Sequence, residues 1–366
     1  MLWHKVPGTD RLPCLSGQSF NGIPVSQGRQ MNVKRSLLLA AVVPGLMAGL
    51  CLAVMTSSKP TATFEGHTGE VNDVILSPDG KTIASRNGTV KLWDVTNRVE
   101  RFTLEHDAGS FAFSPDSRTL ATGGVDGQVK LWDVNNSNVR AIFQGEPYIK
   151  AVAFSPDGKT LASGRNSVQL WDVATGRREA TLEDPQWQEP EEHFSSTAFS
   201  PDGKTLAVQC HYGRVTLWDM TRKEKRATLE GTWPGDGLAF SPDGKTVATG
   251  SGLSFYLWDV GTGQERAEFR HDAFITSVAF SADGTVLAAS DEMTIILWDI
   301  ASGQKRSTFK RGRRLFTNTF LDEFLPTFEG HIVMIDSVQF TPEGKLVALG
   351  RSGSAVLMWE LATARK

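Results

Sequence analysis

Short apolar runs separated by polar turn residues occupy the chain from residue 61 to its end. Residues 151–154 form such a run, and the Ser-Pro-Asp-Gly sequence that follows is typical of a tight turn, because Pro presets φ and Gly permits a positive φ. Residues 160–163 form the next run, and residues 168–171 alternate between apolar and polar positions, as in a half-buried strand. Residues 178–182 are more polar. The pattern predicts a unit of four short strands.

This unit recurs seven times along the chain. A Trp-Asp pair ends the third strand of six units, and Trp359-Glu360 is a conservative seventh copy. The steps between successive tryptophans are 39, 39, 47, 40, 40 and 61 residues, and a Ser-Pro-Asp-Gly turn or a close variant keeps the same phase. We interpret the periodic tryptophans as structural residues that pack between units. They are Trp93, Trp132, Trp171, Trp218, Trp258, Trp298 and Trp359.

Residues 61–366, with these two motifs in phase, resemble the WD-repeat family, whose repeats of about 40–45 residues fold as four-stranded propeller blades. The resemblance implies an all-β, seven-bladed propeller. It also implies a closed ring: residues 61–65 match the outer strand of a repeat, whereas the chain ends seven residues after Trp359. We therefore expect residues 61–65 to complete blade 7, which removes a free sheet edge.

In the WD-repeat family a His, a Ser or Thr, an Asp and the Trp form a hydrogen-bonded set within a blade. The pattern is eroded in this chain, where Asp126 alone lies six residues before its tryptophan. We expect a complete set in blade 2, formed by His106, Thr122, Asp126 and Trp132, and packing alone in most other blades. The resemblance assigns His67 and Asp126 a structural role.

The N-terminal part of the chain has a different character. Residues 37–55 hold no charged side chain, and Lys34 and Arg35 precede them. This layout predicts one apolar helix within residues 31–58. It is longer than the apolar run of about 7–15 residues in a signal peptide and close to the ~20 residues of a spanning helix. Residues 1–30 show no periodicity and are rich in Gly, Pro, Ser and Gln, which predicts a disordered leader. Met31 is an alternative first residue of the protein. We expect the propeller, residues 59–366, outside the cytoplasm, anchored to the membrane or secreted after cleavage.

Charge and cysteine content exclude some functions. Residues 1–58 carry a net charge of +4 and the remainder carries −7, which disfavours nucleic-acid binding. Cys210 is the one cysteine of the repeat region, so a disulfide framework is excluded there, and no CxxC motif predicts a metal site. No HExxH, GxSxG or P-loop motif is present. We expect no catalytic residues, no cofactor and no metal, because the spacing of His193 and His211 matches no known metal site.

Two tryptophans fall outside the repeat pattern. Trp187 and Trp233 lie in connections from an outer strand to the next inner strand, which in a propeller open on one face around the channel. Corresponding positions in neighbouring blades hold Tyr148, His193 and Phe274. Because aromatic side chains dominate interface hot spots, we hypothesise that this arc binds a partner. The alternative is that these side chains cap the core.

The long step before blade 7 contains an insertion of about twenty residues relative to the family period. A basic cluster stands at its start, formed by Lys310, Arg311, Arg313 and Arg314. On an acidic domain this cluster is a candidate contact for an acidic partner or anionic lipid. Solvated arginines are the favoured alternative, because charge runs usually face water.

These observations predict a non-enzymatic scaffold that binds other proteins on the outer side of a membrane. The alternative is a small-ligand binder or hydrolase that uses the mouth of the propeller channel, since fold alone does not decide function. Convergent carboxylates or histidines in the channel would favour that alternative. The inner strands, however, look mostly small or apolar.

Overall fold

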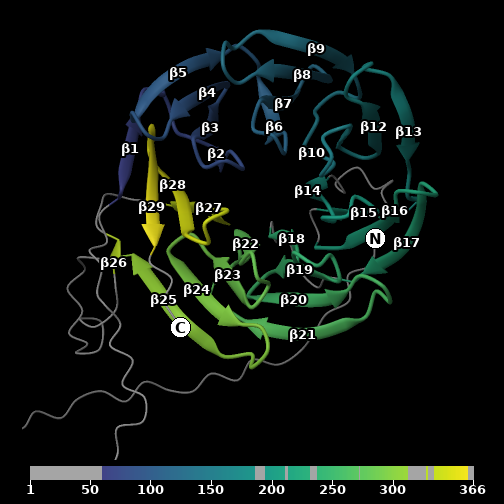
Figure 1. The fold of residues 1–366 in the computed structure, drawn as a ribbon, viewed down its shortest axis with the longest axis vertical. Coiled ribbons are helices and arrows are strands. Elements are labelled where there is room, and N and C mark those ends of the chain that lie inside the picture. Colours follow the sequence, from purple (N-terminus) through teal and green to yellow (C-terminus); the bar gives the residue numbers. More distant parts are fainter. Residues whose placement is uncertain are drawn as a thin grey trace, which may run out of the picture. The chain divides into compact units, whose positions relative to one another are not determined.

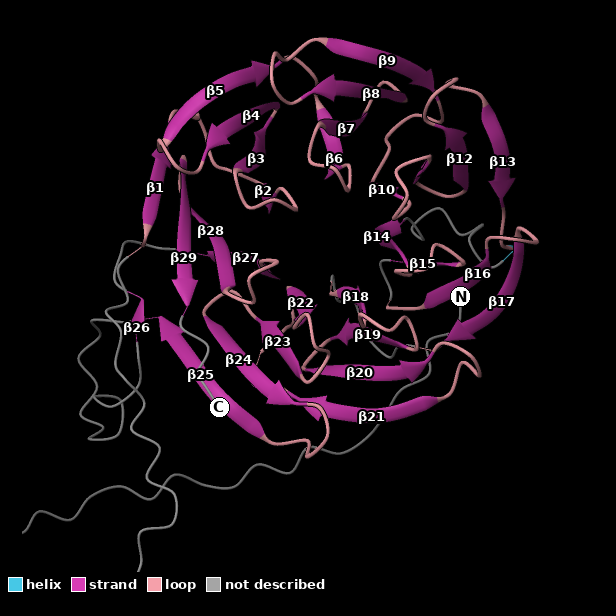
Figure 2. Ribbon diagram, in the orientation of Figure 1, coloured by secondary structure: helices cyan, strands magenta, loops and turns pink. Residues whose placement is uncertain are grey.

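The computed structural model describes residues 60–185, 194–210, 213–230, 237–271, 273–311, 327–328 and 334–361. Seven β-sheets stand around a central channel like the blades of a propeller (Figure 1). Each blade runs from an inner strand beside the channel to an outer strand at the rim, and the described residues are built from strands, turns and loops (Figure 2). The all-β, seven-bladed fold is therefore confirmed, whereas the apolar helix expected at residues 37–55 lies outside the described residues.

The first four blades each contain four antiparallel strands. Blade 1 contains β2 Asp73–Leu76, β3 Thr82–Asn87, β4 Thr89–Asp94 and β5 Val99–Leu104. Blade 2 contains β6 Ala108–Phe113, β7 Thr119–Gly124, β8 Gln128–Asp133 and β9 Val139–Gln144. Blade 3 contains β10 Ala151–Phe154, β11 Thr160–Gly164, β12 Val168–Asp172 and β13 Arg178–Leu182. Blade 4 contains β14 Phe194–Phe199, β15 Thr205–Cys210, β16 Val215–Asp219 and β17 Glu224–Leu229.

The last three blades follow the same order with two additions. Blade 5 contains β18 Leu238–Phe240, β19 Thr246–Ser251, β20 Ser254–Asp259 and β21 Glu265–Arg270. Blade 6 contains β22 Ser277–Phe280, β23 Val286–Ser290, β24 Thr294–Asp299 and β25 Lys305–Arg311, and β26 Thr327–Phe328 lies parallel to β25 as a fifth strand. Blade 7 contains β27 Met334–Phe340, β28 Leu346–Ser352, β29 Ala355–Leu361 and, as its outer strand, β1 Ala62–Glu65.

The Ser-Pro-Asp-Gly turns join the first two strands of each blade through side-chain hydrogen bonds. In blade 1, Ser77 Oγ donates to Asp79 Oδ1 at 2.6 Å and accepts from the Thr82 backbone N–H at 2.9 Å. Gly80 has a φ of 71°, a left-handed conformation that glycine adopts at little cost. The turn residues thus fix the angle between two strands, which explains their recurrence without any role in binding.

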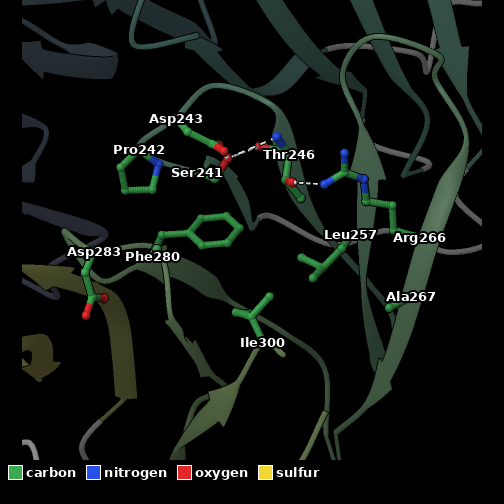
Figure 3. A pocket seen from close by; sticks show the side chains of 11 residues that line it. Ser241, Pro242, Asp243, Thr246, Leu257, Arg266, Ala267, Phe280, Asp283 and Ile300 are labelled. Atoms are coloured by element: carbon green, nitrogen blue, oxygen red, sulfur yellow. Dashed lines mark hydrogen bonds between the residues drawn. The ribbon is translucent and has the colours of Figure 1, made fainter. Parts of the chain in front are cut away.

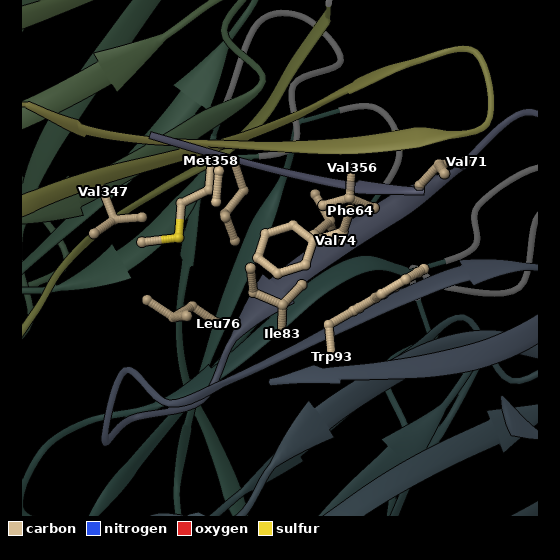
Figure 4. Close-up of a cluster of buried hydrophobic side chains, with 11 residues drawn as sticks. Phe64, Val71, Val74, Leu76, Ile83, Trp93, Val347, Val356 and Met358 are labelled. Atoms are coloured by element: carbon tan, nitrogen blue, oxygen red, sulfur yellow. The ribbon is translucent and has the colours of Figure 1, made fainter. Parts of the chain in front are cut away.

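Each repeat tryptophan packs against the blade that precedes its own. Trp132 of blade 2 shares a buried cluster with Ala84, Val90 and Leu92 of blade 1, and the same relation holds around the ring. Trp93 closes the circle, because its cluster contains Val347 of blade 7 (Figure 4). Seven tryptophans therefore fill seven seams, the structural role that their period predicts.

The ring is closed by its first strand. β1 pairs antiparallel with β29, with Ala62 opposite Met358 and Glu65 opposite Ala355. Phe64 is 1% exposed and its ring centroid lies 5.8 Å from that of Trp93. Residues from the beginning and the end of the domain thus share one core, as Figure 4 shows. The pairing covers the edge of β29, which would otherwise present unpaired backbone groups.

Blade 2 contains the complete polar set expected from the sequence. Trp132 Nε1 donates to Thr122 Oγ1 at 2.8 Å, and His106 Nδ1 lies 2.6 Å from the same oxygen. His106 Nε2 is 3.5 Å from Asp126 Oδ1. Burial lowers the pKa of His106, so the imidazole is neutral at neutral pH and serves as a hydrogen-bonding group.

The polar sets are less eroded than the sequence analysis predicts. Indole donors reach a hydroxyl in blade 1 as well (Trp93 to Ser85, 2.7 Å), in blade 3 (Trp171 to Ser163, 2.8 Å) and in blade 5 (Trp258 to Thr249, 2.8 Å). The expectation that most blades depend on packing alone is therefore wrong. In these blades the hydroxyl lies two residues beyond the residue that pairs with the tryptophan, a relation that depends on the strand register and not on the position of an Asp in the turn.

Blade 6 contains a close contact between a histidine and an aspartate that the sequence did not predict. His271 Nδ1 lies 3.3 Å from Asp291 Oδ2, and both side chains are buried. Asp291 stands seven residues before Trp298, whereas Asp126 stands six before Trp132, because Asp291 is the first residue after β23 and Asp126 is the second after β7. The residue six positions before Trp298 is therefore the neighbouring Glu292.

Replacing Ala289 with serine is expected to stabilise blade 6. Ala289 occupies the hydroxyl position, and Trp298 Nε1 is buried without a hydrogen-bond partner among the described residues. A serine there supplies the missing acceptor, and a satisfied buried donor contributes about 1 kcal/mol. Urea unfolding of Ala289→Ser and of the control Ala288→Ser, which faces the other seam, would measure this. The account predicts a gain for the first and a loss for the second; equal losses would contradict it.

Candidate interaction face

One face of the ring is built from the outer-to-inner connections and the turns between the second and third strands; we call it the connection face. The two kinds of loop are joined by backbone hydrogen bonds. Tyr148 N–H donates to Val125 O at 3.1 Å, and His271 N–H donates to Leu253 O at 2.7 Å. Val71 N–H donates to Gly353 O at 3.0 Å across the closing seam. These bonds give the loops fixed positions, which favours their use as a recognition surface.

Exposed apolar side chains gather on the connection face. Eight large hydrophobic residues are exposed in the described part of the chain, and five of them lie in these connections and turns: Val125, Tyr148, Leu253, Phe274 and Met293. The other three lie in the outer strands β5 and β9. Exposed aromatic residues in rigid loops are a common feature of protein interfaces.

Tyr148 and Phe274 do not cap the core. Each stands directly before a buried isoleucine, and Ile149 and Ile275 are 1% and 2% exposed. Those isoleucines belong to the clusters between blades 2 and 3 and between blades 5 and 6. Tyr148 and Phe274 are 55% and 64% exposed, so their rings are available to a partner. The isoleucines, and not Tyr148 and Phe274, therefore cap the core.

Tyr148 also has an unusual backbone. Five non-glycine residues have positive φ in the described part of the chain, and Tyr148 (φ 60°) is the one in an outer-to-inner connection. The other four, Arg98, Ser117, Ser137 and Lys223, stand where other repeats carry a turn glycine. A bulky residue in this conformation costs roughly 1–2 kcal/mol. Such strain is often found at functional sites, where the surrounding structure holds the residue in place.

Phe274 borders a shallow apolar pocket of about 480 Å³ in blade 5. Leu253 and Tyr256 form its apolar part, and Glu268 and Arg270 stand at its rim. Glu268 Oε1 accepts from Ser254 Oγ at 2.8 Å, which holds the carboxylate in place. The pocket can receive one apolar side chain of a partner.

The other predicted binding residues have different positions. Lys310 and Arg311 belong to β25, where Lys310 pairs with Thr294 and Arg311 pairs with Phe328. They are thus part of a strand at the rim of blade 6. Trp187, His193, Trp233, Arg313 and Arg314 lie outside the described residues, so their role stays a prediction.

The central channel contains a hollow of about 970 Å³. The residues that line it include Asp73 and Arg86 of blade 1, Lys150 before β10, Glu292 of blade 6, and Asp336 and Arg351 of blade 7. The channel is therefore more charged than the small and apolar inner-strand residues suggested, and its three carboxylates are the observation that favours the alternative of a small-ligand site. Asp73 and Asp336 stand on the inner strands β2 and β27, whereas the other charged residues come from second strands, a turn and a connection.

Among these groups, Asp336 has a strongly shifted pKa. Its carboxylate lies 3.2 Å from Arg351 Nε, and Arg351 Nη1 donates to Val71 O at 2.6 Å across the closing seam. Burial raises the pKa of Asp336 to about 7, and the negative charges of Asp73 and Glu292 act in the same direction. The attraction of Arg351 opposes this shift without cancelling it.

Stability should therefore depend on pH through Asp336. The folded state holds this proton more tightly than the unfolded state, so Asp336 lowers stability progressively as pH rises from about 4 to 7.

Asp336→Asn removes this dependence while Arg351 keeps its charge. The difference in unfolding free energy between variant and wild type should shift in favour of the variant by on the order of 2 kcal/mol between pH 5 and pH 8. The buried His67, with a pKa of about 4, is common to both proteins and cancels. Urea titrations at both pH values test this; a constant difference would contradict it.

Two crevices on the opposite face are formed by the turn residues that recur in every blade. Between blades 5 and 6 a crevice of about 380 Å³ is lined by Ser241, Asp243, Thr246 and Arg266 (Figure 3). Arg266 Nη1 donates to Thr246 Oγ1 at 2.8 Å. A similar crevice between blades 3 and 4 is lined by the corresponding Ser-Pro-Asp turn residues. Because the same hollow recurs with the blade architecture, neither crevice indicates a dedicated binding site.

The described residues contain no group of three or more His, Cys, Asp or Glu side chains placed to hold a metal ion. Within the same residues, no helix has the length and apolar character required to cross a bilayer. Cys210 is buried.

Comparison with known proteins identifies the family. The model of the WD domain, G-beta repeat, matches residues 58–94, 99–133, 137–172, 228–259 and 263–299. The chain belongs to the WD-repeat family. Each match runs from the outer strand of one blade to the third strand of the next, and the five matches end at the Trp-Asp pairs of blades 1, 2, 3, 5 and 6 of this WD-repeat propeller. Blades 4 and 7 follow the two long steps between tryptophans, and the sheet order shows that both adopt the same fold.

Individual relatives match a shorter part of this WD-repeat protein. The chain is 40% identical over 70 residues to small ribosomal subunit protein RACK1 of Candida albicans, which is 18% of this chain and 22% of the relative. It is 44% identical over 64 residues to the protein of the same name from Schizosaccharomyces pombe, 16% of this chain and 20% of the relative. It is 39% identical over 70 residues to periodic tryptophan protein 2 of Arabidopsis thaliana, 18% of this chain and 8% of the relative. The chain thus spans about a fifth or less of these relatives.

Proposed function

We propose that this WD-repeat protein is a non-enzymatic scaffold that binds segments of other proteins on its connection face. The observation that carries the proposal is the placement of Tyr148 and Phe274. Both rings are more than half exposed in loops that backbone hydrogen bonds hold in place. A partner that covers them gains the burial of large apolar surfaces at small entropic cost.

The relatives support the same class of function. Proteins named as components of the small ribosomal subunit work within an assembly, and the matched repeats of this chain are 36–44% identical to theirs. We propose that this chain also works within an assembly, with partners of its own. The ribosome is one candidate among them.

Partner capture with matched variants tests the proposal. Tyr148→Ser/Phe274→Ser removes two exposed rings from the connection face, and Val99→Ser/Val139→Ser removes two exposed valines from the rim. We expect the first variant to lose most of the proteins captured by wild type, and the second to keep them. Both should keep the wild-type unfolding midpoint, because exposed substitutions change stability by less than about 0.5 kcal/mol. Equal retention by both variants would reject the connection face.

We further propose that the propeller lies outside the cytoplasm. The support is the sequence of residues 31–58, with basic residues before an uncharged apolar run. N-terminal sequencing of the mature protein and protease treatment of intact cells would test this. A propeller protected from external protease in intact cells and recovered with an uncleaved N-terminus in the soluble cytoplasmic fraction would contradict it.

A further inference from the structure

Two cationic residues of blade 3 stand at the end of the β10–β11 ladder on the connection face. In the β10–β11 ladder Ala151 stands opposite Gly164, and Lys150 N–H donates to Gly164 O at 2.9 Å. Continuation of this register places Lys150 opposite Arg165. Like charges at opposed positions repel each other, so this arrangement is unfavourable unless an anion is present.

Neither cation is neutralised within the part of the chain that the structure describes. Arg165 and Lys150 form no ion pair there, and Arg165 Nε is shielded from water without a hydrogen-bond acceptor. Arg86 and Arg351, which line the channel together with Lys150, face Asp73 and Asp336. Lys150 and Arg165 therefore differ from the other basic residues at the channel mouth.

Tyr148 completes this patch. The Arg165 guanidinium carbon lies 5.4 Å from the centroid of the Tyr148 ring, so the ring supports the side chain from one side. Tyr148 is exposed and held with a positive φ. Glu146, the acidic residue closest in sequence, already accepts from Ser167 Oγ at 2.7 Å. The patch thus offers two charges and one aromatic surface to an incoming ligand.

We propose that Tyr148, Lys150 and Arg165 form a docking site for a carboxylate-bearing peptide segment of a partner protein, an inference that rests on the proposed scaffold function. A carboxylate bound here forms charge-assisted hydrogen bonds with both cations. An apolar neighbour in the peptide packs on the exposed ring of Tyr148. The ligand's charge complements the patch, which is the usual source of specificity and rapid association at such surfaces.

The opposite side of the channel limits where the acidic group binds. Asp73, Glu292 and Asp336 line the hollow on blades 1, 6 and 7. Arg86 and Arg351 already pair with Asp73 and Asp336, so a peptide carboxylate on that side meets occupied cations and the negative charge of Glu292, whereas on blade 3 it meets Lys150. The channel mouth is therefore polarised, and a bound peptide has one preferred orientation.

Fluorescence anisotropy with the purified full-length chain tests this proposal. The probe is a dye-labelled peptide of four glutamates around one leucine, and the matched lysine peptide is the control ligand. We expect the glutamate peptide alone to bind. Lys150→Gln/Arg165→Gln should weaken that binding by about tenfold or more, and added salt should weaken the wild-type binding. Lys159→Gln, which removes an exposed cation from the opposite end of the same hairpin, should leave the affinity unchanged.

Three results would overturn the inference. They are failure of the glutamate peptide to bind wild type, wild-type affinity in Lys150→Gln/Arg165→Gln, and binding of a phosphoserine version without binding of the glutamate peptide. These outcomes are separate from a failure of the scaffold function. If the peptide fails but Tyr148→Ser/Phe274→Ser still loses its captured partners, the connection face remains the binding surface and only the acidic partner is rejected.

Discussion

Replacing Phe64 with alanine should destabilise the propeller by about 3–5 kcal/mol, the usual cost of truncating a buried phenylalanine. Phe64 is 1% exposed and lies in the cluster that joins β1, blade 7 and Trp93 of blade 1. Its loss leaves a cavity where the ring closes. The effect extends beyond one side chain, because β1 is the outer strand of blade 7 and Phe64 supplies much of its contact with the core. Urea unfolding followed by tryptophan fluorescence measures the change.

The neighbouring residue provides a matched control for this experiment. Thr63 lies on the same strand with its side chain exposed, so Thr63→Ala keeps the backbone pairing with β29 and removes no core contact. Its expected effect is below about 0.5 kcal/mol. Comparable unfolding midpoints for Phe64→Ala and Thr63→Ala would show that the closing strand contributes little to stability.

Thr122→Val in blade 2 is expected to cost about 2–4 kcal/mol. The substitution preserves shape but removes the oxygen that accepts from Trp132 Nε1 and contacts His106 Nδ1. Two buried polar atoms then lose their partner, and each unsatisfied group costs about 1–3 kcal/mol. Chemical denaturation of the purified domain measures the loss.

The same change at Thr216 separates the hydrogen bonds from the substitution itself. Thr216 in blade 4 is fully buried, and its Oγ1 has no hydrogen-bond partner among the described residues. Thr216→Val should be neutral or slightly stabilising, because it removes an unsatisfied hydroxyl. If both valine variants lose the same stability, the polar set of blade 2 contributes no more than ordinary packing.

The periodic residues made much of the fold predictable from the sequence. Tryptophans at regular steps fill the seams between blades, and the turn motifs fix the angles between strands, so local pattern and tertiary role coincide. The ring closure was predictable for a related reason, since residues 61–65 match an outer strand that the C-terminal repeat lacks.

Features that depend on cross-strand register were not predictable in this way. The His271–Asp291 pair was not predictable from spacing, because Asp291 occupies a different position in its turn than Asp126 does. The juxtaposition of Lys150 and Arg165 follows from pairing between β10 and β11, and the Asp336–Arg351 pair joins two strands of blade 7. Sequence spacing does not specify which side chains meet across a sheet.

The candidate site was predictable in part. Alignment of the repeats placed Tyr148 and Phe274 at equivalent positions before the inner strands, and the structure shows both rings exposed there. The sequence did not reveal which neighbour would fill the capping role, because Ile149 and Ile275 differ from them only by one position in a short loop. The φ of Tyr148 and its contact with Arg165 required the folded structure.

Hydrogen–deuterium exchange of the protein with and without a captured partner tests the central claim most directly. The account predicts that the partner protects the connections around Tyr148 and Phe274 and the turns around Val125 and Leu253. Exchange in the outer strands β5, β9 and β13 should stay unchanged. Protection confined to the outer strands or to the Ser-Pro-Asp-Gly turns of the opposite face would contradict the claim that the connection face is the binding surface.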